Sequence, residues 1–318
     1  MFKDKHVFVA GGRTGFVGSN IAKALLAKGA TVYAHSKSGT TPGFFAPGTP
    51  NLIELCGDLS VAAPLPPRID YVLHCAAHTS GAHEMVTNPV AQITENLLMN
   101  TALMDSAAKA GVKKFLFVSS SAVYPDVEGL ITEDLGFQGD PPPTYFGPAW
   151  MKRYAEKLGE FYYRRYAMEV LIIRPSNIYG PYSGFDLEHS HVLPALIRKF
   201  VEKGDPVEVW GTPDVVRDFI FANDFVEGAL KAFETFQGYE VMNIASGEQY
   251  TIGEAVTHIA ALTGYTGEIR YNSSKPMTIK QRRIDTSKAE RLLGFRAHTP
   301  FREGLKMTID WYLSTLGK

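Results

Sequence analysis

Cysteine is scarce in this sequence, and its scarcity excludes one class of protein. Only Cys56 and Cys75 occur in 318 residues. A small secreted domain held together by disulfides would need more. Cys75 lies in the apolar run 71–76, which favours a buried, unreactive thiol over a metal ligand or a disulfide. We therefore expect a reducing, cytoplasmic setting.

Long apolar runs and excess charge are missing as well. No apolar stretch approaches the about 20 residues that a membrane-spanning helix needs. Lys3 and Lys5 lead straight into the first apolar run, so we expect no signal peptide. The formal net charge is -1 at pH 7 and gives no support for a nucleic-acid or membrane-surface partner. No ordered set of acidic and cysteine ligands surrounds the histidines, so we expect no metal site.

A glycine-rich loop follows the first apolar run. Residues 7–10 are predicted to form a buried strand, and a helical pattern begins soon after it. Between them, Gly12 permits a tight turn, Gly15 lets the backbone approach a pyrophosphate, and Gly18 allows the helix to pack closely on the strand. A helix N-terminus offers free N–H groups and a positive dipole to an anion. This order of elements predicts a dinucleotide site.

The second predicted strand, 31–35, ends without an acidic residue. In NAD sites an Asp or Glu at this point bonds the ribose 2′-hydroxyl, but here Ser36 and Lys37 follow. Lys37 and Arg13 suit the 2′-phosphate of NADP; the plainer alternative is that both are solvated cations. Asp58 is either an acceptor for the adenine amino group or a turn residue. We expect NADP, with NAD possible. The predicted contacts of this loop and strand are Gly12, Arg13, Thr14, Gly15, Phe16, Val17, Lys37 and Asp58.

Strands and helices alternate through the first half of the chain. Beyond the opening unit, the predicted strands are 31–35, 52–56, 71–76, 114–119 and 170–174, and the predicted helices are 88–110 and 149–167. Such alternation implies an α/β fold of the Rossmann type, a doubly wound parallel sheet with helices on both faces. We assign residues 1–174 and about 218–245 to this cofactor domain, and within the second range we expect a helix that Asn223 caps and that runs to about residue 236. Residues 175–217 and 246–318 form a smaller, mixed α/β substrate lobe, with the site in the cleft between the two.

Several motifs resemble those of the extended short-chain dehydrogenase/reductases that act on nucleotide-sugars. The motifs are GGRTGFVGSN at 11–20, GDL at 57–59, HCAAH at 74–78, VSSSAVYP at 118–125, RPSNIYGP at 174–181, RDFIFANDF at 217–225 and MNIASGE at 242–248. They cover nearly the whole chain in order. The resemblance implies an enzyme that binds NAD(P) and a nucleotide-diphosphate sugar. It also implies a homodimer, in which two long helices of each copy pack across a dyad.

Within that family, the chain is most similar to the GDP-L-fucose synthases. The stretches GFDLEHSHVLPALIRKF at 184–200 and VEVWGTPDVVRDF at 207–219 carry this likeness. It implies a GDP-linked sugar, with His191 as an acid for the sugar carbons. The substrate contacts that it implies are Lys199, Trp210, Arg217, Arg282 and Asn177. Converging cations suit a diphosphate, although any one of these arginines could instead form a surface ion pair.

The catalytic positions of the family are only partly filled. Ser120 matches its serine, and Lys152 matches the lysine that binds the nicotinamide ribose and lowers the pKa of a catalytic tyrosine. That tyrosine belongs four residues earlier, where Pro148 stands. A proline is comfortable in the first turn of a helix but has no proton to give. Ala122 stands where the GDP-L-fucose synthases have the cysteine base for epimerisation, so epimerisation by that Cys–His pair is not expected.

Three hypotheses follow from the missing tyrosine. In the first, Tyr145 is its replacement. In the second, Ser120, Lys152, His191 or an acid such as Glu133 or Asp134 carries out non-standard chemistry on the nucleotide-sugar. In the third hypothesis the chain has lost turnover and is a binding or regulatory protein. We expect an enzyme, with epimerisation, 4-keto reduction or a related isomerisation as the reaction. The predicted catalytic residues are Ser120, Lys152, Tyr145 and His191.

Overall fold

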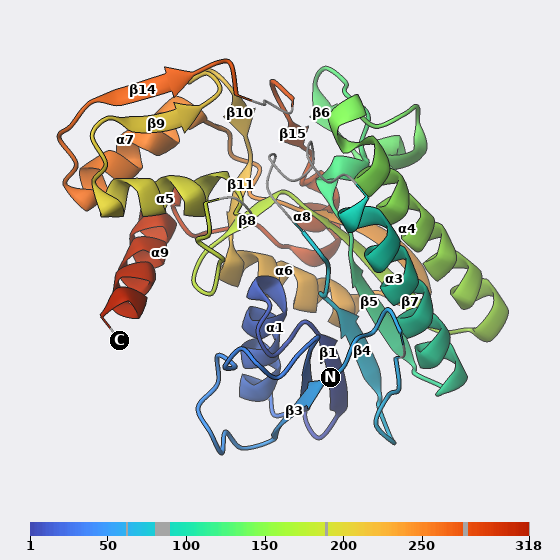
Figure 1. Cartoon of the computed structure of the whole chain (residues 1–318). Helices are drawn as coiled ribbons and strands as arrows, with labels where there is room; N and C mark the ends of the chain where they lie inside the picture. The colour runs from blue at the N-terminus through green and yellow to red at the C-terminus, as the bar shows by residue number, and fades with distance from the viewer. Residues whose placement is uncertain (62, 80–89, 188–189, 276–278, 318) are drawn as a thin grey trace.

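A parallel sheet of seven strands forms the centre of the molecule (Figure 1). The computed structural model describes residues 1–318 except 62, 80–89, 188–189, 276–278 and 318. The strand order is β12-β7-β5-β4-β1-β2-β3. The bounds are β1 His6–Ala10, β2 Thr31–Ser36, β3 Leu52–Cys56, β4 Tyr71–His74, β5 Lys114–Val118, β7 Glu169–Pro175 and β12 Tyr239–Ile244. Every neighbouring pair is parallel, as the alternation of elements predicted.

Helices cover both faces of this sheet, so the doubly wound arrangement is confirmed. On one face lie α1 (Phe16–Ala27), α6 (Ala222–Thr235) and α8 (Ser287–Leu293), whose apolar side chains share one buried core with the sheet. On the other face lie α3 (Ala91–Lys109) and α4 (Phe146–Tyr166), which pack side by side over a second core. Burying each large aliphatic side chain of such a core contributes about 1.5–3 kcal/mol.

A smaller group of elements has its own apolar core beyond the carboxyl ends of the strands (Figure 1). It contains α5 (Val192–Glu202), α7 (Ile252–Thr263) and α9 (Phe301–Leu316). Short strand pairs accompany these helices: β9 (Val207–Trp210) with β14 (Ile269–Asn272), β10 (Val216–Arg217) with β13 (Tyr250–Thr251), and β8 (Asn177–Tyr179) with β11 (Phe219–Phe221). α8 instead packs on the sheet core. The boundaries that we gave for the two domains stay a prediction.

Short 3₁₀ helices and one more strand pair lie beside the start of α4. They are η1 (Ser121–Val123), η2 (Glu133–Phe137) and η3 (Pro143–Tyr145), and β6 (Leu130–Ile131) pairs with β15 (Arg283–Ile284). All of them except β15 occupy the proline-rich stretch between β5 and α4. In the described part of the chain, no helix is long and apolar enough to cross a membrane.

Most predicted elements are present, with errors at their ends. Helix α4 begins at Phe146, three residues before the predicted start at 149, because η3 leads directly into it. Helix α6 begins at Ala222 with Phe221 as its N-cap residue, so a start with Asn223 as the cap was wrong. The predicted start of α3 at 88 lies outside the described residues.

Candidate active site

The glycine loop after β1 has the shape of a phosphate cradle. The residue with left-handed backbone is Gly11, at φ 78°, and not Gly12, to which we assigned the turn. A Cβ atom at Gly15 would lie 2.6 Å from the carbonyl oxygen of Gly11, and a Cβ at Gly18 would be closer still. Gly15 is also the N-cap residue of α1, and no side chain of the described residues caps that helix. The first N–H groups of α1 are therefore available to a phosphate, as a dinucleotide site requires.

Arg13, the cation of this loop, is bound to the protein itself. Its Nε lies 3.3 Å from Oε2 of Glu54, and its NH1 donates to the carbonyl oxygen of Thr41 at 2.7 Å. The Arg13 side chain is 11% exposed and that of Glu54 is 38% exposed. A 2′-phosphate would therefore have to compete with the Glu54 carboxylate for this guanidinium.

Lys37 and Asp58 form an ion pair with each other. Nζ of Lys37 lies 3.2 Å from Oδ2 of Asp58 and 3.1 Å from Oε2 of Glu95. Asp58 also accepts from the backbone N–H and the hydroxyl of Ser60, which lowers the pKa of its carboxyl. Because the pair is largely exposed, it holds Lys37 only weakly and can open for a phosphate. The role of Asp58 toward adenine stays a prediction.

Ser120 and Lys152 are both placed by the carboxyl end of β5. Nζ of Lys152 donates to the carbonyl oxygen of Val118 at 2.8 Å and lies 4.7 Å from the centre of the Phe117 ring. Burial lowers the pKa of Lys152 to about 8. Ser120 directly follows this strand segment, and its Oγ accepts from the backbone N–H of Ala122 at 3.0 Å. The hydroxyl proton of Ser120 remains to be donated.

Pro148 is the third residue of α4, where the missing backbone N–H has no helical partner in any case. Tyr145 immediately precedes the helix as its N-cap residue, and its ring centre is 5.7 Å from the guanidinium carbon of Arg282. Tyr145 also interacts electrostatically with Arg217. The structure therefore brings Tyr145, Arg217 and Arg282 together, as the substrate assignment of the arginines requires.

Arg282 is a buried cation fixed against η1. It is 6% exposed and donates to the carbonyl oxygens of Ser121 and, at 3.3 Å, Tyr124. Its Nε is buried without a partner among the described residues. Burial first, and the like charge of Arg217 in addition, lower the pKa of Arg282 to about 10. Two cations held together in this way favour an anion between them.

Arg217 belongs to β10 and reaches the same place from the smaller lobe. Its guanidinium donates to the carbonyl oxygens of Val216 at 2.8 Å and Ile279 at 2.7 Å. Asn177, another predicted substrate contact, is exposed on β8, and its side-chain amide donates to the carbonyl oxygen of Asp218 at 2.9 Å.

The remaining predicted residues lie on α5 and β9. Nζ of Lys199 donates to the carbonyl oxygen of Glu208 at 2.7 Å and lies 5.3 Å from the centre of the Trp210 ring. Lys275, which the sequence did not single out, lies 5.2 Å from the same ring. His191 is the N-cap residue of α5 and is exposed to solvent. In the described residues, no group of three or more His, Cys, Asp or Glu side chains could hold a metal ion.

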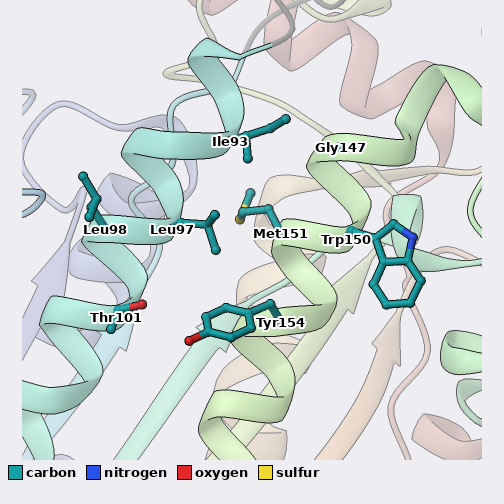
Figure 2. A pocket seen from close by; sticks show the side chains of 8 residues that line it. All are labelled: Ile93, Leu97, Leu98, Thr101, Gly147, Trp150, Met151 and Tyr154. Atoms are coloured by element: carbon teal, nitrogen blue, oxygen red, sulfur yellow. The ribbon is translucent and has the colours of Figure 1, made fainter.

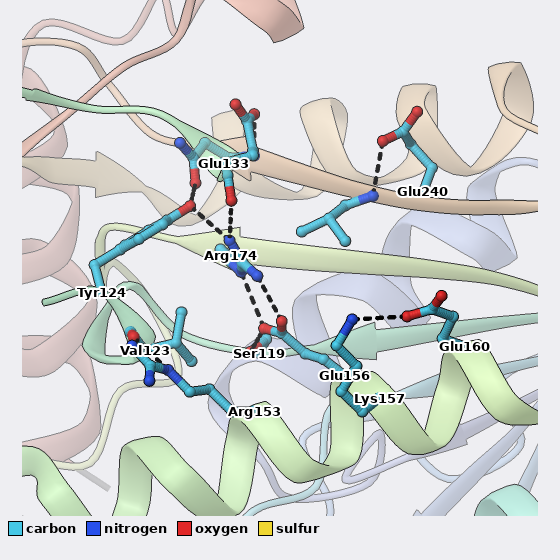
Figure 3. A network of polar contacts seen from close by, with 12 residues as sticks. Ser119, Val123, Tyr124, Glu133, Arg153, Glu156, Lys157, Glu160, Arg174 and Glu240 are labelled. Carbon is cyan, nitrogen blue, oxygen red and sulfur yellow. Dashed lines mark hydrogen bonds and ion pairs between the residues drawn. The ribbon is translucent and has the colours of Figure 1, made fainter. Parts of the chain in front are cut away.

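A network of polar contacts joins α4 to β7 (Figure 3). Glu156, one helical turn after Lys152, accepts from Nε and NH2 of Arg174 at 3.0 and 2.6 Å and from the Ser119 hydroxyl. Glu156 and Arg174 have almost no exposed surface. The sequence contains one signal for this pair, because Glu156 lies four residues after Lys152 and therefore on the same face of the helix.

Glu133 belongs to the same network. Its carboxylate accepts from the backbone N–H of Asn243 at 2.8 Å, and its carbonyl oxygen accepts from Arg174 at 2.7 Å. Burial raises the pKa of Glu133. These bonds give Glu133 a structural role, which weakens its case as the acid of a non-standard reaction.

Comparison with known proteins shows which family this chain belongs to. The sequence signature of the NAD dependent epimerase/dehydratase family matches residues 7–245. The probable GDP-L-fucose synthase 1 of Oryza sativa subsp. japonica is 32% identical over 328 residues, which cover 99% of this chain and 94% of that protein. A dTDP-4-dehydro-6-deoxy-D-allose reductase of a Streptomyces species is 30% identical over 312 residues, covering 95% and 94%. The crystal structure of a UDP-glucose 4-epimerase from Thermotoga maritima, with UDP-glucose, superposes with a TM-score of 0.84 at 25% identity, covering 98% of this chain and 99% of that one.

Proposed function

Because the chain belongs to the NAD dependent epimerase/dehydratase family, we propose that it modifies a nucleotide-diphosphate sugar with NADP bound in the glycine cradle. The observation that carries this proposal is the pair of Arg217 and Arg282, which face Tyr145 beside η1 and the end of β5. Two cations at the entrance to a cofactor site suit a diphosphate, whose oxygens take charge-assisted hydrogen bonds. Likeness to the GDP-L-fucose synthases favours a GDP-linked sugar.

Each residue has a defined task in this proposal. The nicotinamide, when bound, supplies or accepts a hydride at the sugar. Lys152 holds the cofactor ribose with its ammonium group, and Ser120 donates its hydroxyl proton to the sugar oxygen that reacts. Tyr145 supplies the proton that the family draws from a tyrosine at position 148. Arg217, Arg282 and Lys199 bind the diphosphate, and Trp210 and Asn177 bind the remainder of the nucleotide-sugar.

The absence of a tyrosine at position 148 and of a cysteine at position 122 reduces the number of reactions that the site could catalyse. Ala122 has no group that could remove a proton from a sugar carbon. His191, the N-cap residue of α5, is the residue that the family resemblance proposes as an acid for the sugar carbons. Reduction of a 4-keto sugar, or isomerisation with the cofactor retained, fits these residues better than epimerisation at two carbons.

The first experiment is turnover with a GDP-4-keto-6-deoxy sugar, followed by the absorbance of the reduced nicotinamide and by NMR of the product. Tyr145→Phe is expected to lower kcat by about 10²–10⁴-fold, the usual contribution of a positioned proton donor. Tyr163→Phe, which changes a tyrosine on the outer part of α4, is the control and should leave kcat unchanged. Adding Pro148→Tyr to Tyr145→Phe should restore turnover, because position 148 lies one helical turn before Lys152.

The other hypotheses predict different outcomes of the same experiment. Product without net oxidation of the cofactor supports isomerisation by Ser120, Lys152 and His191. Full activity of Tyr145→Phe refutes the role of Tyr145. Tight nucleotide-sugar binding without product under every condition supports the alternative, a binding or regulatory protein.

We also propose a homodimer that packs through α3 and α4. A groove of about 560 Å³ runs between these helices and is lined mainly by apolar side chains (Figure 2). Leu98, Trp150 and Tyr154 are exposed there, at 53%, 40% and 51%. An exposed apolar groove on two long helices is typical of a protein–protein contact. A second copy related by a dyad would cover it.

A further inference from the structure

The strand pair β9–β14 presents a polar, aromatic face that the proposed function does not fully use. On β9, Val207 and Val209 are buried at 2% and 1%, whereas Glu208 and Trp210 alternate with them and point outward. Trp210 is opposite Asn272 of β14 in the parallel register. The pair lies over α5 and α7, and β9 runs toward β10, which carries Arg217 (Figure 1).

Glu208 is fixed and ionised on this face. Its Oε1 accepts from Nε1 of Trp210 at 3.0 Å, and its Oε2 accepts from Nδ2 of Asn272 at 3.2 Å. These bonds, together with nearby Lys275 and Lys199, lower the pKa of the Glu208 carboxyl. Each carboxylate oxygen can accept a further hydrogen bond, so two adjacent acceptors remain for a ligand.

Trp210 supplies a flat surface next to this carboxylate. The ammonium groups of Lys199 and Lys275 lie 5.3 and 5.2 Å from the ring centre. Desolvation and the charge of Lys275 lower the pKa of Lys199, so the two cations repel each other in the free protein. A bound nucleotide would reduce this repulsion. Its base would stack on the indole ring in place of one ammonium group, and the two lysines would turn toward its phosphates.

We propose that Glu208 is the specificity-determining residue for the base of the nucleotide-sugar and that it selects guanine. The proposal rests on the function proposed above. Guanine presents two neighbouring N–H donors, at N1 and at the 2-amino group, which match the two oxygens of one carboxylate. Uracil and thymine present a single N–H between two carbonyl oxygens, which the carboxylate repels. Adenine presents its amino group beside an unprotonated ring nitrogen, which makes one bond at most.

The experiment compares nucleoside diphosphates whose bases present different hydrogen-bonding edges. Calorimetry on the wild-type protein should give GDP an affinity about tenfold or more above that of inosine diphosphate, which lacks only the 2-amino group. UDP should bind more weakly than either. In Glu208→Gln the GDP affinity is expected to fall by about tenfold, and the ratio of GDP to inosine diphosphate should approach one.

The change in the ratio of GDP to inosine diphosphate affinity distinguishes recognition of the base by Glu208 from a purely structural role of Glu208. Loss of the bond to Trp210 alone would weaken all three nucleotides equally and would overturn the proposal, as would an unchanged ratio. Glu202→Gln, which removes an exposed carboxylate paired with Arg198 on α5, is the matched control and should leave every affinity unchanged. If the wild-type protein binds UDP most tightly, the base assignment fails while the proposed function stands. If no nucleoside diphosphate binds, the proposed function itself fails.

Discussion

Lys152 is half-protonated near pH 8, because burial lowers its pKa to about 8. The ammonium group, which holds the cofactor ribose in our proposal, predominates below that pH and is lost as pH rises through it. We expect the affinity for NADPH to fall about tenfold between pH 7 and pH 9, since the protonated fraction falls from about nine-tenths to about one-tenth. Titration of NADPH fluorescence at each pH measures this change.

Lys152→Arg is the matched variant for that measurement. Arginine stays charged at every pH in this range. The variant should bind NADPH with an affinity that does not change between pH 7 and pH 9, even if its absolute affinity is lower. A decline of the same size in Lys152→Arg would show that another group titrates.

Glu54 controls how much of the Arg13 charge is available to the cofactor. The two side chains form an ion pair at 3.3 Å beside the carboxyl ends of β1 and β2. Glu54→Gln removes the competing carboxylate, and the affinity for NADP should rise about two- to fivefold, as for the loss of a partly exposed ion pair. The affinity for NAD, which has no 2′-phosphate, should not change. Glu234→Gln, which breaks the exposed pair with Lys28, is the control; an equal rise for both cofactors would refute a role in selecting the phosphate.

At the scale of elements, the ion pair between Glu156 and Arg174 joins α4 to β7. The pair has 0% and 1% of its side-chain surface exposed, so either group alone would be a buried charge without a partner. Glu156→Gln should lower the free energy of unfolding by about 3–5 kcal/mol, measured by urea denaturation at pH 7. Glu160→Gln, on the same helix but in surface pairs with Lys157 and Arg164, should cost less than about 1 kcal/mol. Equal losses would contradict the special role of the buried pair.

The main elements could be predicted from the sequence because their signals are local. The apolar run before Gly11 places β1 within one residue, the helical period after it predicts the presence of α1, and alternation along the chain predicts the parallel sheet. The left-handed position could not be assigned to Gly11 from spacing alone, since two adjacent glycines fit the same turn. The capping of α6 failed for a similar reason, because Asn223 and Asp224 both follow the true start of the helix.

The site was less predictable because its parts come from distant segments. Arg282 reaches the carbonyl oxygen of Ser121 across 161 positions in the sequence, and no local pattern specifies that contact. The family resemblance pointed to Arg217 and Arg282 as substrate contacts. The pairing of Arg13 with Glu54 and the position of Lys275 beside Trp210 depend on the conformation of loops, which the periodicity of the sequence does not predict. Glu208 was overlooked because it alternates with buried valines as any solvent-facing strand residue does.

At the scale of the whole molecule, aromatic side chains link the two sides of the site. Phe44 lies in the same loop as Thr41, whose carbonyl oxygen accepts from Arg13. The ring centre of Phe44 is 4.7 Å from that of Tyr182, which is 5.4 Å from the ring centre of Trp311 on α9. On the opposite side, the segment 279–284 connects β10 to β6 and η1 through Arg217, Arg282 and the β15–β6 pair. The cofactor loop and the substrate residues are thus held by contacts at two places, which fixes their separation.

The outer helices of the sheet set the expected oligomeric state. If α3 and α4 pack against their copies, the groove between them becomes the centre of the interface, and a stable dimer would bury about 800 Å² on each subunit. Tyr154→Glu places a charge in that groove, and light scattering should then give a monomer where the wild-type protein gives a dimer. Leu313→Glu, on the exposed end of α9, is the control and should remain dimeric. Nucleotide binding should persist in the monomer, because Arg217, Arg282 and Trp210 lie on other elements. A wild-type protein that is monomeric at micromolar concentration would refute the dimer, and a Tyr154→Glu variant that stays dimeric would place the interface elsewhere.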